Sequence, residues 1–266
     1  MFEHAVFCAQ TVQGTAIRNL FELMKDVLVE SNIIATPEGM RLLAIDSAQC
    51  VVTSVHLQAH SFEHYECKQR TTIGVNMANM YKLVKSASNN DVITLWKNAC
   101  EDVLNIRLQN SERSSLTDYK LKLLDIDELP IQAPSCEFEY VVSLSSSEFQ
   151  RMARDMAMLA ASVHIKNDDR TLTLSCYGEY ADQETVLEAS QNLIINRDPT
   201  KAPVVGGPES SEYSLRYLIM FARGSSLSSS VQLYLQRGMP LILSYNAATL
   251  GKVLFCLGAL EPTAAL

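Results

Sequence analysis

Eight basic side chains, arranged as four pairs, are the residues of this sequence whose spacing best suits a chemical role. The two bases of a pair are three or seven residues apart, so on a helix both project from one side. Guanidinium and ammonium groups in such positions bind phosphate oxygens. The pattern therefore indicates contact with a polyanion through Arg18, Lys25, Lys82, Lys85, Arg151, Arg154, Arg216 and Arg223.

The charge balance of the chain makes this placement informative. Its 266 residues include 22 basic and 30 acidic side chains, which gives a formal charge of -8. One basic pair on one helix would be ordinary solvation, but four pairs on a net-acidic chain indicate an arranged positive surface. Duplex DNA is the natural candidate for this polyanion. Because no helix groups Asn, Gln and Arg to read base edges, we expect phosphate contacts that are independent of sequence.

Four amphipathic helices would position these bases. Apolar residues recur at i, i+3, i+4 and i+7 in four segments, which predicts helices of about three turns with the basic pairs on their exposed flanks. The four apolar stripes are Ile17, Leu20, Phe21 and Met24; Met80, Leu83, Val84 and Ala87; Phe149, Met152, Ala153 and Met156; and Leu215, Leu218, Ile219 and Ala222.

Most of the remaining chain reads as short strands closed by turns. Hairpins are predicted at residues 32–46, 91–109 and 231–245. The order strand, helix, hairpin, then helix, polar connection, hairpin occurs twice, which predicts two copies of one α+β domain. We expect domains at residues 1–123 and 138–266. The acidic, proline-containing segment 124–137 is predicted to be an extended linker between them.

Other patterns give no sign of catalysis or of a cofactor. His56, His60 and His64 have helical metal-ligand spacing, but their segment alternates like a strand, so no metal site is expected. Nucleophile-elbow and phosphate-loop motifs are missing, and the chain is not expected to be an enzyme. Seven scattered cysteines indicate free thiols inside the cell. No apolar run is long enough to span a membrane, and the start lacks a signal-peptide pattern.

Several blocks of sequence resemble the eukaryotic-type DNA sliding clamps, the proliferating cell nuclear antigen family. The resemblance runs from Met1 to about Leu257. Its blocks are IDSAQCVVTSVHL (45–57), HYECKQRTTIGVNMANMYKLVKSASNNDVITL (64–95), DYKLKLLDID (118–127), SSEFQRMARDM (146–156) and SLRYLIMFARGSSLSSSV (214–231).

The resemblance implies a DNA-clamp fold, with two similar domains of two helices each on antiparallel β-sheets, assembled as a pseudo-sixfold homotrimeric ring. The eight bases match positions that line the hole of the ring. Such a clamp encircles duplex DNA and tethers DNA polymerase, the clamp loader, ligase and nucleases, in the nucleus or at a cytoplasmic replication site if viral. Two alternatives stay open: a subunit of a heterotrimeric checkpoint clamp, and an unrelated β-rich enzyme or ligand-binding module.

The resemblance also implies a subunit contact made by two edge strands. These match residues 116–123 and about 185–191, with Leu116, Tyr119, Leu121, Leu123, Val186, Leu187 and Glu188 as the contact residues. Main-chain pairing would set the geometry, and apolar packing would supply most of the affinity.

Partners of the family dock a short peptide under the interdomain linker. The matching positions are Ile45, Gln49, Cys50, Val52, Ile131, Ala133, Pro134, Tyr217, Pro240, Cys256, Gly258 and Ala259. The chain departs from the family at Gln49-Cys50, where His-Val is usual, and at residues 256–259, where Tyr-Leu-Ala-Pro is usual. A smaller, less aromatic pocket is expected. The family's regulatory lysine falls on Asp169, so no modification is expected there.

Overall fold

A computed structural model describes residues 4–89, 91–110, 112, 114–127, 138–197, 210–236 and 239–260. The chain forms two compact units. Unit 1 comprises Met1–Ala133 with Asn246–Val253, and unit 2 comprises Pro134–Tyr245 with Leu254–Leu266. The predicted linker at 124–137 is described only as far as Asp127.

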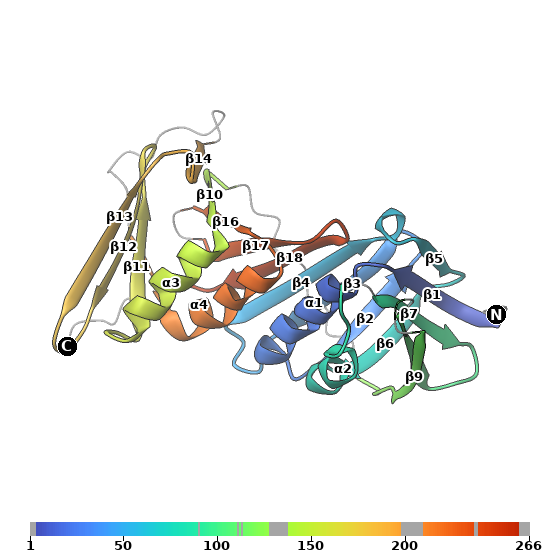
Figure 1. The fold of residues 1–266 in the computed structure, drawn as a ribbon. Helices are drawn as coiled ribbons and strands as arrows, with labels where there is room; N and C mark the ends of the chain where they lie inside the picture. Colours follow the sequence, from blue (N-terminus) through green and yellow to red (C-terminus); the bar gives the residue numbers. More distant parts are fainter. Residues whose placement is uncertain are drawn as a thin grey trace. The chain divides into compact units, whose positions relative to one another are not determined.

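Unit 1 contains two helices and two runs of antiparallel strands (Figure 1). One run has the order β5-β1-β7-β8-β9 and the other the order β4-β3-β2-β6. The elements are β1 (Ala5–Thr11), α1 (Gly14–Val27), β2 (Glu30–Thr36), β3 (Gly39–Ile45), β4 (Val51–Gln58), the 3₁₀ turn η1 (Ala59–Ser61), β5 (His64–Cys67), β6 (Thr71–Asn76), α2 (Met77–Val84), β7 (Asp91–Asn98), β8 (Val103–Asn110) and β9 (Ser115–Lys122).

Unit 2 repeats this plan. Its strand orders are β14-β10-β16-β17-β18 and β13-β12-β11-β15. The elements are β10 (Tyr140–Ser145), α3 (Ser146–Ala157), β11 (Ser162–Asn167), β12 (Thr171–Tyr177), β13 (Asp182–Glu188), β14 (Leu193–Arg197), β15 (Ser211–Ser214), α4 (Leu215–Ala222), the 3₁₀ turn η2 (Arg223–Ser226), β16 (Ser230–Leu235), β17 (Leu241–Ala247) and β18 (Gly251–Leu257).

The two strand orders coincide element by element when the second half of the chain is laid on the first. Strand β1 corresponds to β10, α1 to α3, α2 to α4, β9 to β18 and β4 to β13. The internal duplication predicted from the order of elements is therefore confirmed, as are the three hairpins.

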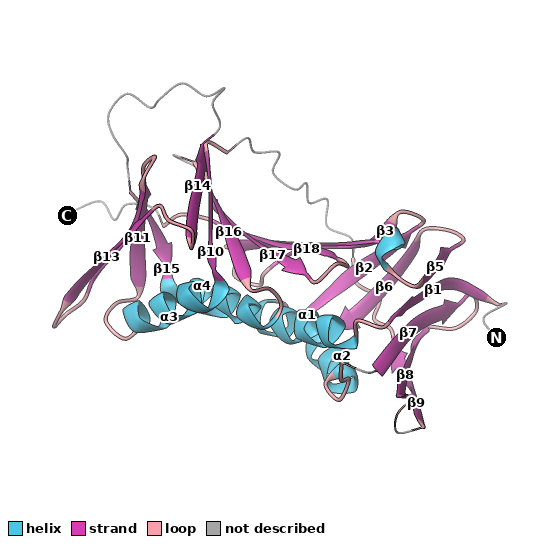
Figure 2. Cartoon of the chain, turned by 45° about the horizontal axis from the view of Figure 1, so that its top comes forward, coloured by secondary structure: helices cyan, strands magenta, loops and turns pink. Residues whose placement is uncertain are grey.

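Each unit sets a pair of helices against its strands, α1 beside α2 and α3 beside α4 (Figure 2). The stripe residues of α1 and α3 are all at most 4% exposed, because these faces pack on the sheets. In α2 and α4 the residues Leu83 and Ile219 are only half-buried. Phe221, outside the predicted stripe, is fully buried and stacks on Phe255 at 4.4 Å between ring centroids.

The predicted length of three turns is wrong for α2 and α4, which have 8 residues each. Helix α2 begins where the Asn76 side chain accepts a hydrogen bond from the Asn79 amide, and it ends before Ala87, which is nevertheless buried. Helix α4 tightens into η2 at Arg223. The α2 stripe extends beyond its helix because Ala87, in the following turn, still packs on the core, whereas the α4 stripe ends with the helix at Ala222.

The first residues of the predicted linker lie against unit 1. The Leu124 amide donates to the Gly74 carbonyl at 2.9 Å, and the Asn32 side chain donates to the Ile126 carbonyl at 2.8 Å. A side chain at Gly74 would collide with the Leu124 carbonyl, so this close approach requires glycine.

Candidate DNA-binding and contact surfaces

The bases of α1 are less exposed than the sequence predicts. The Arg18 Nη1 donates to the Ala87 carbonyl at 3.0 Å, and its Nε donates to the Asn19 side chain at 3.2 Å. Lys25 Nζ lies 3.0 Å from an Asp26 carboxylate oxygen and 5.1 Å from the centroid of the Tyr81 ring on α2. Both side chains are half-buried because they join α1 to the region of α2, which corrects the expectation that all eight bases project from exposed flanks.

The other six bases are exposed: Lys82, Lys85, Arg151, Arg154, Arg216 and Arg223. Lys85 and Arg223 stand just beyond the last residues of α2 and α4, where a positive charge also interacts favourably with the helix dipole. Arg151 is 3.6 Å from Asp155, one turn along α3, and its side chain is 68% exposed. Such a surface pair contributes little and leaves the guanidinium accessible to a phosphate.

Strands β9 and β13 are the outermost strands of their sheets, as the matched contact segments require. Leu116 is 55% exposed and Val186 51%. Tyr119, Leu121 and Leu187 alternate with exposed neighbours and are half-buried, Leu123 follows β9 half-buried, and Glu188 is exposed. An edge strand that shows apolar side chains is a template for pairing with another strand.

The four unit 1 residues matched to the peptide pocket lie together at the β3–β4 turn. Ile45 and Val52 face each other across the two strands, and Gln49 and Cys50 are exposed in the turn. One carboxylate oxygen of Asp46 accepts from the Cys50 and Val51 amides, both at 2.8 Å. This holds Gln49 at a φ of 59° and fixes the shape of the turn.

The unit 2 members of the same set lie on α4 and around β17 and β18. Tyr217 is half-buried on α4, with its ring 6.2 Å from that of Phe221, and Cys256 is 9% exposed on β18. Pro240 precedes β17, while Gly258 and Ala259 follow β18 and are exposed. Ile131, Ala133 and Pro134 lie outside the described residues.

Neither a metal cluster nor a membrane helix is present in the part of the chain that the structure describes. No three His, Cys, Asp or Glu side chains there converge to hold a metal ion. The described helices are too short and polar for any to cross a membrane. His56 lies on β4, His60 in η1 and His64 at the start of β5, so the three do not share a helix face.

Comparison with known proteins identifies the family. Residues 6–129 match the family model of the proliferating cell nuclear antigen N-terminal domain, and residues 132–260 match that of its C-terminal domain. The chain belongs to the proliferating cell nuclear antigen family. The resemblance carried by the sequence blocks is thereby confirmed, and an unrelated β-rich enzyme or ligand-binding module is set aside.

Two relatives illustrate the distance from other members of the proliferating cell nuclear antigen family. The chain is 32% identical over 261 residues to the probable DNA polymerase sliding clamp 1 of Paramecium bursaria Chlorella virus 1, covering 95% of this chain and 96% of the relative. It is 28% identical over 238 residues to the proliferating cell nuclear antigen of Chaetomium thermophilum, covering 90% and 92% of the two chains.

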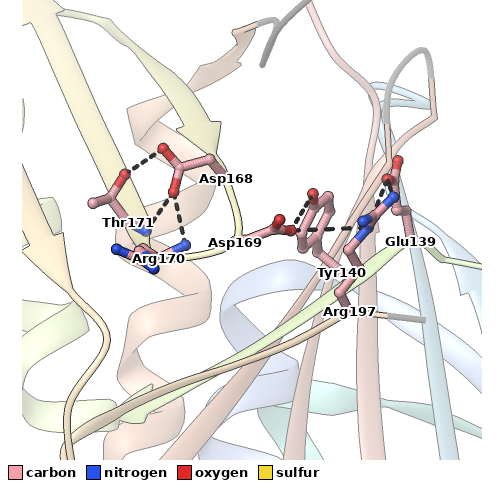
Figure 3. Close-up of polar contacts among 7 residues, drawn as sticks. All are labelled: Glu139, Tyr140, Asp168, Asp169, Arg170, Thr171 and Arg197. Carbon is pink, nitrogen blue, oxygen red and sulfur yellow. Dashed lines mark hydrogen bonds and ion pairs between the residues drawn. The ribbon is translucent and has the colours of Figure 1, made fainter. Parts of the chain in front are cut away.

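Asp169, at the position of the family's regulatory lysine, takes part in structural contacts rather than pointing freely to solvent (Figure 3). The Tyr140 hydroxyl donates to Asp169 at 2.9 Å, and Arg197 Nε lies 3.8 Å from the same carboxylate. Arg197 also pairs with Glu139 at 3.3 Å. Burial, together with the bond to Asp169, raises the pKa of Tyr140 to about 12, because both favour the protonated hydroxyl that donates this bond. The group ties the β11–β12 turn to β10 and β14.

The preceding residue, Asp168, shapes the β11–β12 turn itself. Its carboxylate accepts from the Arg170 amide at 2.8 Å and from the Thr171 amide at 2.7 Å. These bonds lower the pKa of Asp168, with the Arg170 amide as the largest cause. The turn is therefore an Asx turn whose hydrogen bonds favour the ionised carboxylate.

Four charged residues of the two edge strands were not among the predicted contact residues, which included only Glu188 of this kind. On β9 the exposed Lys120 and Lys122 alternate with the half-buried Tyr119 and Leu121. On β13 the exposed Asp182 and Glu184 stand on either side of the half-buried Gln183. The two-residue period of a strand could have identified them, since the two lysines, and likewise the two acids, stand two residues apart and so share one face.

Proposed function

We propose that this chain is a DNA sliding clamp, a non-enzymatic processivity factor that closes as a homotrimeric ring around duplex DNA. The ring would tether DNA polymerase, a clamp loader, ligase and nucleases through short peptide motifs. Its site of action would be the nucleus, or a cytoplasmic replication site if the protein is viral. The domains would be residues 1–123 and 138–266, joined by the linker 124–137.

The duplicated helix pair with its exposed bases carries the proposal. Each unit presents two adjacent helices whose outward side chains include arginine or lysine, on a chain with a formal charge of -8. Acidic surfaces elsewhere would keep DNA away from the rest of the molecule. Contacts to phosphates alone permit sliding because they are the same at every base pair.

The unpaired outer edges of β9 and β13 support ring closure through these strands. Each is the outermost strand of its sheet in the described residues, and Leu116 on β9 and Val186 on β13 are exposed. Main-chain pairing made between copies would join β9 of one to β13 of the next.

The partner-peptide pocket is proposed at the residues matched from the family. The rigid β3–β4 turn with Gln49 and Cys50, together with Tyr217, Pro240 and Cys256, would form its walls. Gly258 and Ala259 offer little side-chain surface to a bound peptide. The pocket would therefore prefer partner peptides with less bulky anchor side chains than the family's usual aromatic pair.

Retention on DNA with blocked ends tests the proposal without a loader. A closed ring should thread onto linear duplex DNA and be trapped when streptavidin is then bound to biotin at both ends. The expected result is retention on DNA blocked after mixing and little retention on DNA blocked beforehand. Equal retention in both cases would show an ordinary groove-binding protein and overturn the proposal.

The mass in solution separates a self-closing clamp from a subunit of a heterotrimeric checkpoint clamp. Light scattering across a dilution series should give about three times the 29.5 kDa chain mass. A chain that stays monomeric at every concentration would favour the heterotrimeric alternative.

A further inference from the structure

Strand β9 carries a net positive charge on its outer face. Leu116, Asp118, Lys120 and Lys122 alternate along the strand, so they share one face, and all four are exposed. The acidic member of the set is neutralised. Arg107 Nε and Nη2 donate to the two oxygens of Asp118 at 2.7 and 2.8 Å, and the guanidinium lies 5.4 Å from the centroid of the Trp96 ring. The charge left over is that of Lys120 and Lys122.

Strand β13 carries the opposite charge on the matching face. Asp182, Glu184 and Glu188 are exposed there, with Val186 between them. Glu184 accepts a hydrogen bond from the Ser175 hydroxyl at 3.3 Å. In the described part of the chain none of the three forms an ion pair, and neither do Lys120 and Lys122.

We infer that the two edge strands select each other by charge, so that β9 of one copy accepts β13 of a second copy while like edges repel. The inference rests on the proposed function and names what directs its self-assembly. Two copies joined by a twofold axis would place β9 on β9 or β13 on β13 and bring like charges together. Opposite edges allow only the head-to-tail contact from which a ring can close.

The spacing of the charges also selects one register. If β9 and β13 pair antiparallel, as β8–β9 and β12–β13 do, placing Lys120 opposite Glu184 places Lys122 opposite Asp182. A shift by two residues in either direction leaves at most one of these lysines opposite an acid. A shift by one residue turns the charges to opposite faces.

Apolar side chains on the same faces supply area to bury. Leu116 and Val186 are each about half exposed, and Tyr177, which is 65% exposed, faces Asp182 across β12 and β13. Apolar burial gives most of the affinity of such contacts, whereas the charges give direction, register and dependence on salt. Assembly should therefore weaken as salt rises.

Charge reversal followed by charge restoration tests the inference. The variants are Lys120→Glu with Lys122→Glu, then Asp182→Lys with Glu184→Lys, and finally all four changes in one chain. The matched control is Lys68→Glu with Lys252→Glu, two exposed lysines, one just after β5 and the other on β18. Mass is measured by light scattering across a dilution series, and circular dichroism verifies folding.

Each two-residue reversal should raise the protein concentration at which half of the assembly has dissociated, by about tenfold or more. The four-residue variant should recover wild-type assembly because its edges are again opposite in sign, and the control should match the wild type. Unchanged assembly of the two-residue variants, or a folded four-residue variant that stays monomeric, overturns the inference. So does a monomeric wild type. If assembly follows this pattern but end-blocked DNA is not retained, the proposed function fails and the inference stands.

Discussion

Arg18, one of the bases proposed to contact DNA, links α1 to the turn that follows α2. Its guanidinium donates to the Ala87 carbonyl at 3.0 Å, and the equivalent residue of unit 2, Gln150, donates to the Ala222 carbonyl at 3.1 Å. Residues Ala87 and Ala222 occupy the same position in the two stripes. A neutral side chain thus makes the same link in unit 2, which indicates that the link needs a donor rather than a charge.

Replacement of Arg18 should therefore depend on hydrogen bonding. Arg18→Gln is expected to preserve the unfolding free energy, whereas Arg18→Leu should lower it by about 0.5–1.5 kcal/mol, because the Ala87 carbonyl loses its donor. Denaturant unfolding measures both. Equal losses in the two variants would contradict the prediction. Arg18→Gln should also weaken DNA retention less than Arg151→Gln, since the Arg151 side chain is 68% exposed.

At the scale of the element, strand β9 is held in place by the side chains of its neighbours. Arg107 on β8 lies over the Trp96 ring and forms the two hydrogen bonds to Asp118. The bond from Arg107 is the largest cause of the lowered pKa of Asp118. A lowered folded-state pKa contributes stability above the ordinary carboxyl pKa, and this contribution is lost as the pH falls through the folded-state value.

Arg107→Gln should consequently lower the unfolding free energy by about 0.5 kcal/mol at pH 7, a small effect because water screens the half-exposed Asp118. The difference in unfolding free energy between this variant and the wild type should stay constant from about pH 8 to about pH 5. It should shrink below about pH 4, where Asp118 becomes protonated. Denaturant titrations across this range measure it. A difference that grew on acidification would contradict the assigned ion pair.

At the scale of the whole molecule, the six exposed bases that we propose to contact DNA belong to a chain with a formal charge of -8. Local positive surfaces dominate the field that a DNA phosphate meets within one Debye length, about 10 Å at 0.1 M salt. Distant acids then have little effect on affinity but discourage DNA from binding elsewhere.

The double reversal Arg151→Glu with Arg154→Glu should reduce retention on end-blocked DNA without changing the mass or the thermal unfolding. Both side chains are exposed on α3, away from its buried stripe. The slope of log K for DNA binding against log salt concentration should also become shallower, by about one unit for each phosphate that the variant no longer neutralises. The control is again Lys68→Glu with Lys252→Glu. Unaltered retention in the arginine variant would remove α3 from the DNA-binding surface.

Local periodicity in the sequence determined the helices, the hairpins and the duplication of the domain. Apolar stripes at helical spacing, and alternation along a strand, relate residues only a few positions apart. Turn residues between two strands are likewise a local pattern. The candidate bases could be found in the same way, because a helix places residues three or seven apart on one side.

Only the tertiary structure decided how exposed the candidate bases are and what net charge the edge strand β9 carries. Arg18 meets a carbonyl 69 residues away in the chain, and the net charge of β9 follows from a contact between Arg107 and Asp118 across two strands. The short length of α2 and α4, 8 residues each, likewise became visible only in the structure. Such contacts join segments that no local pattern relates, since they depend on how sheets and helices come together in three dimensions.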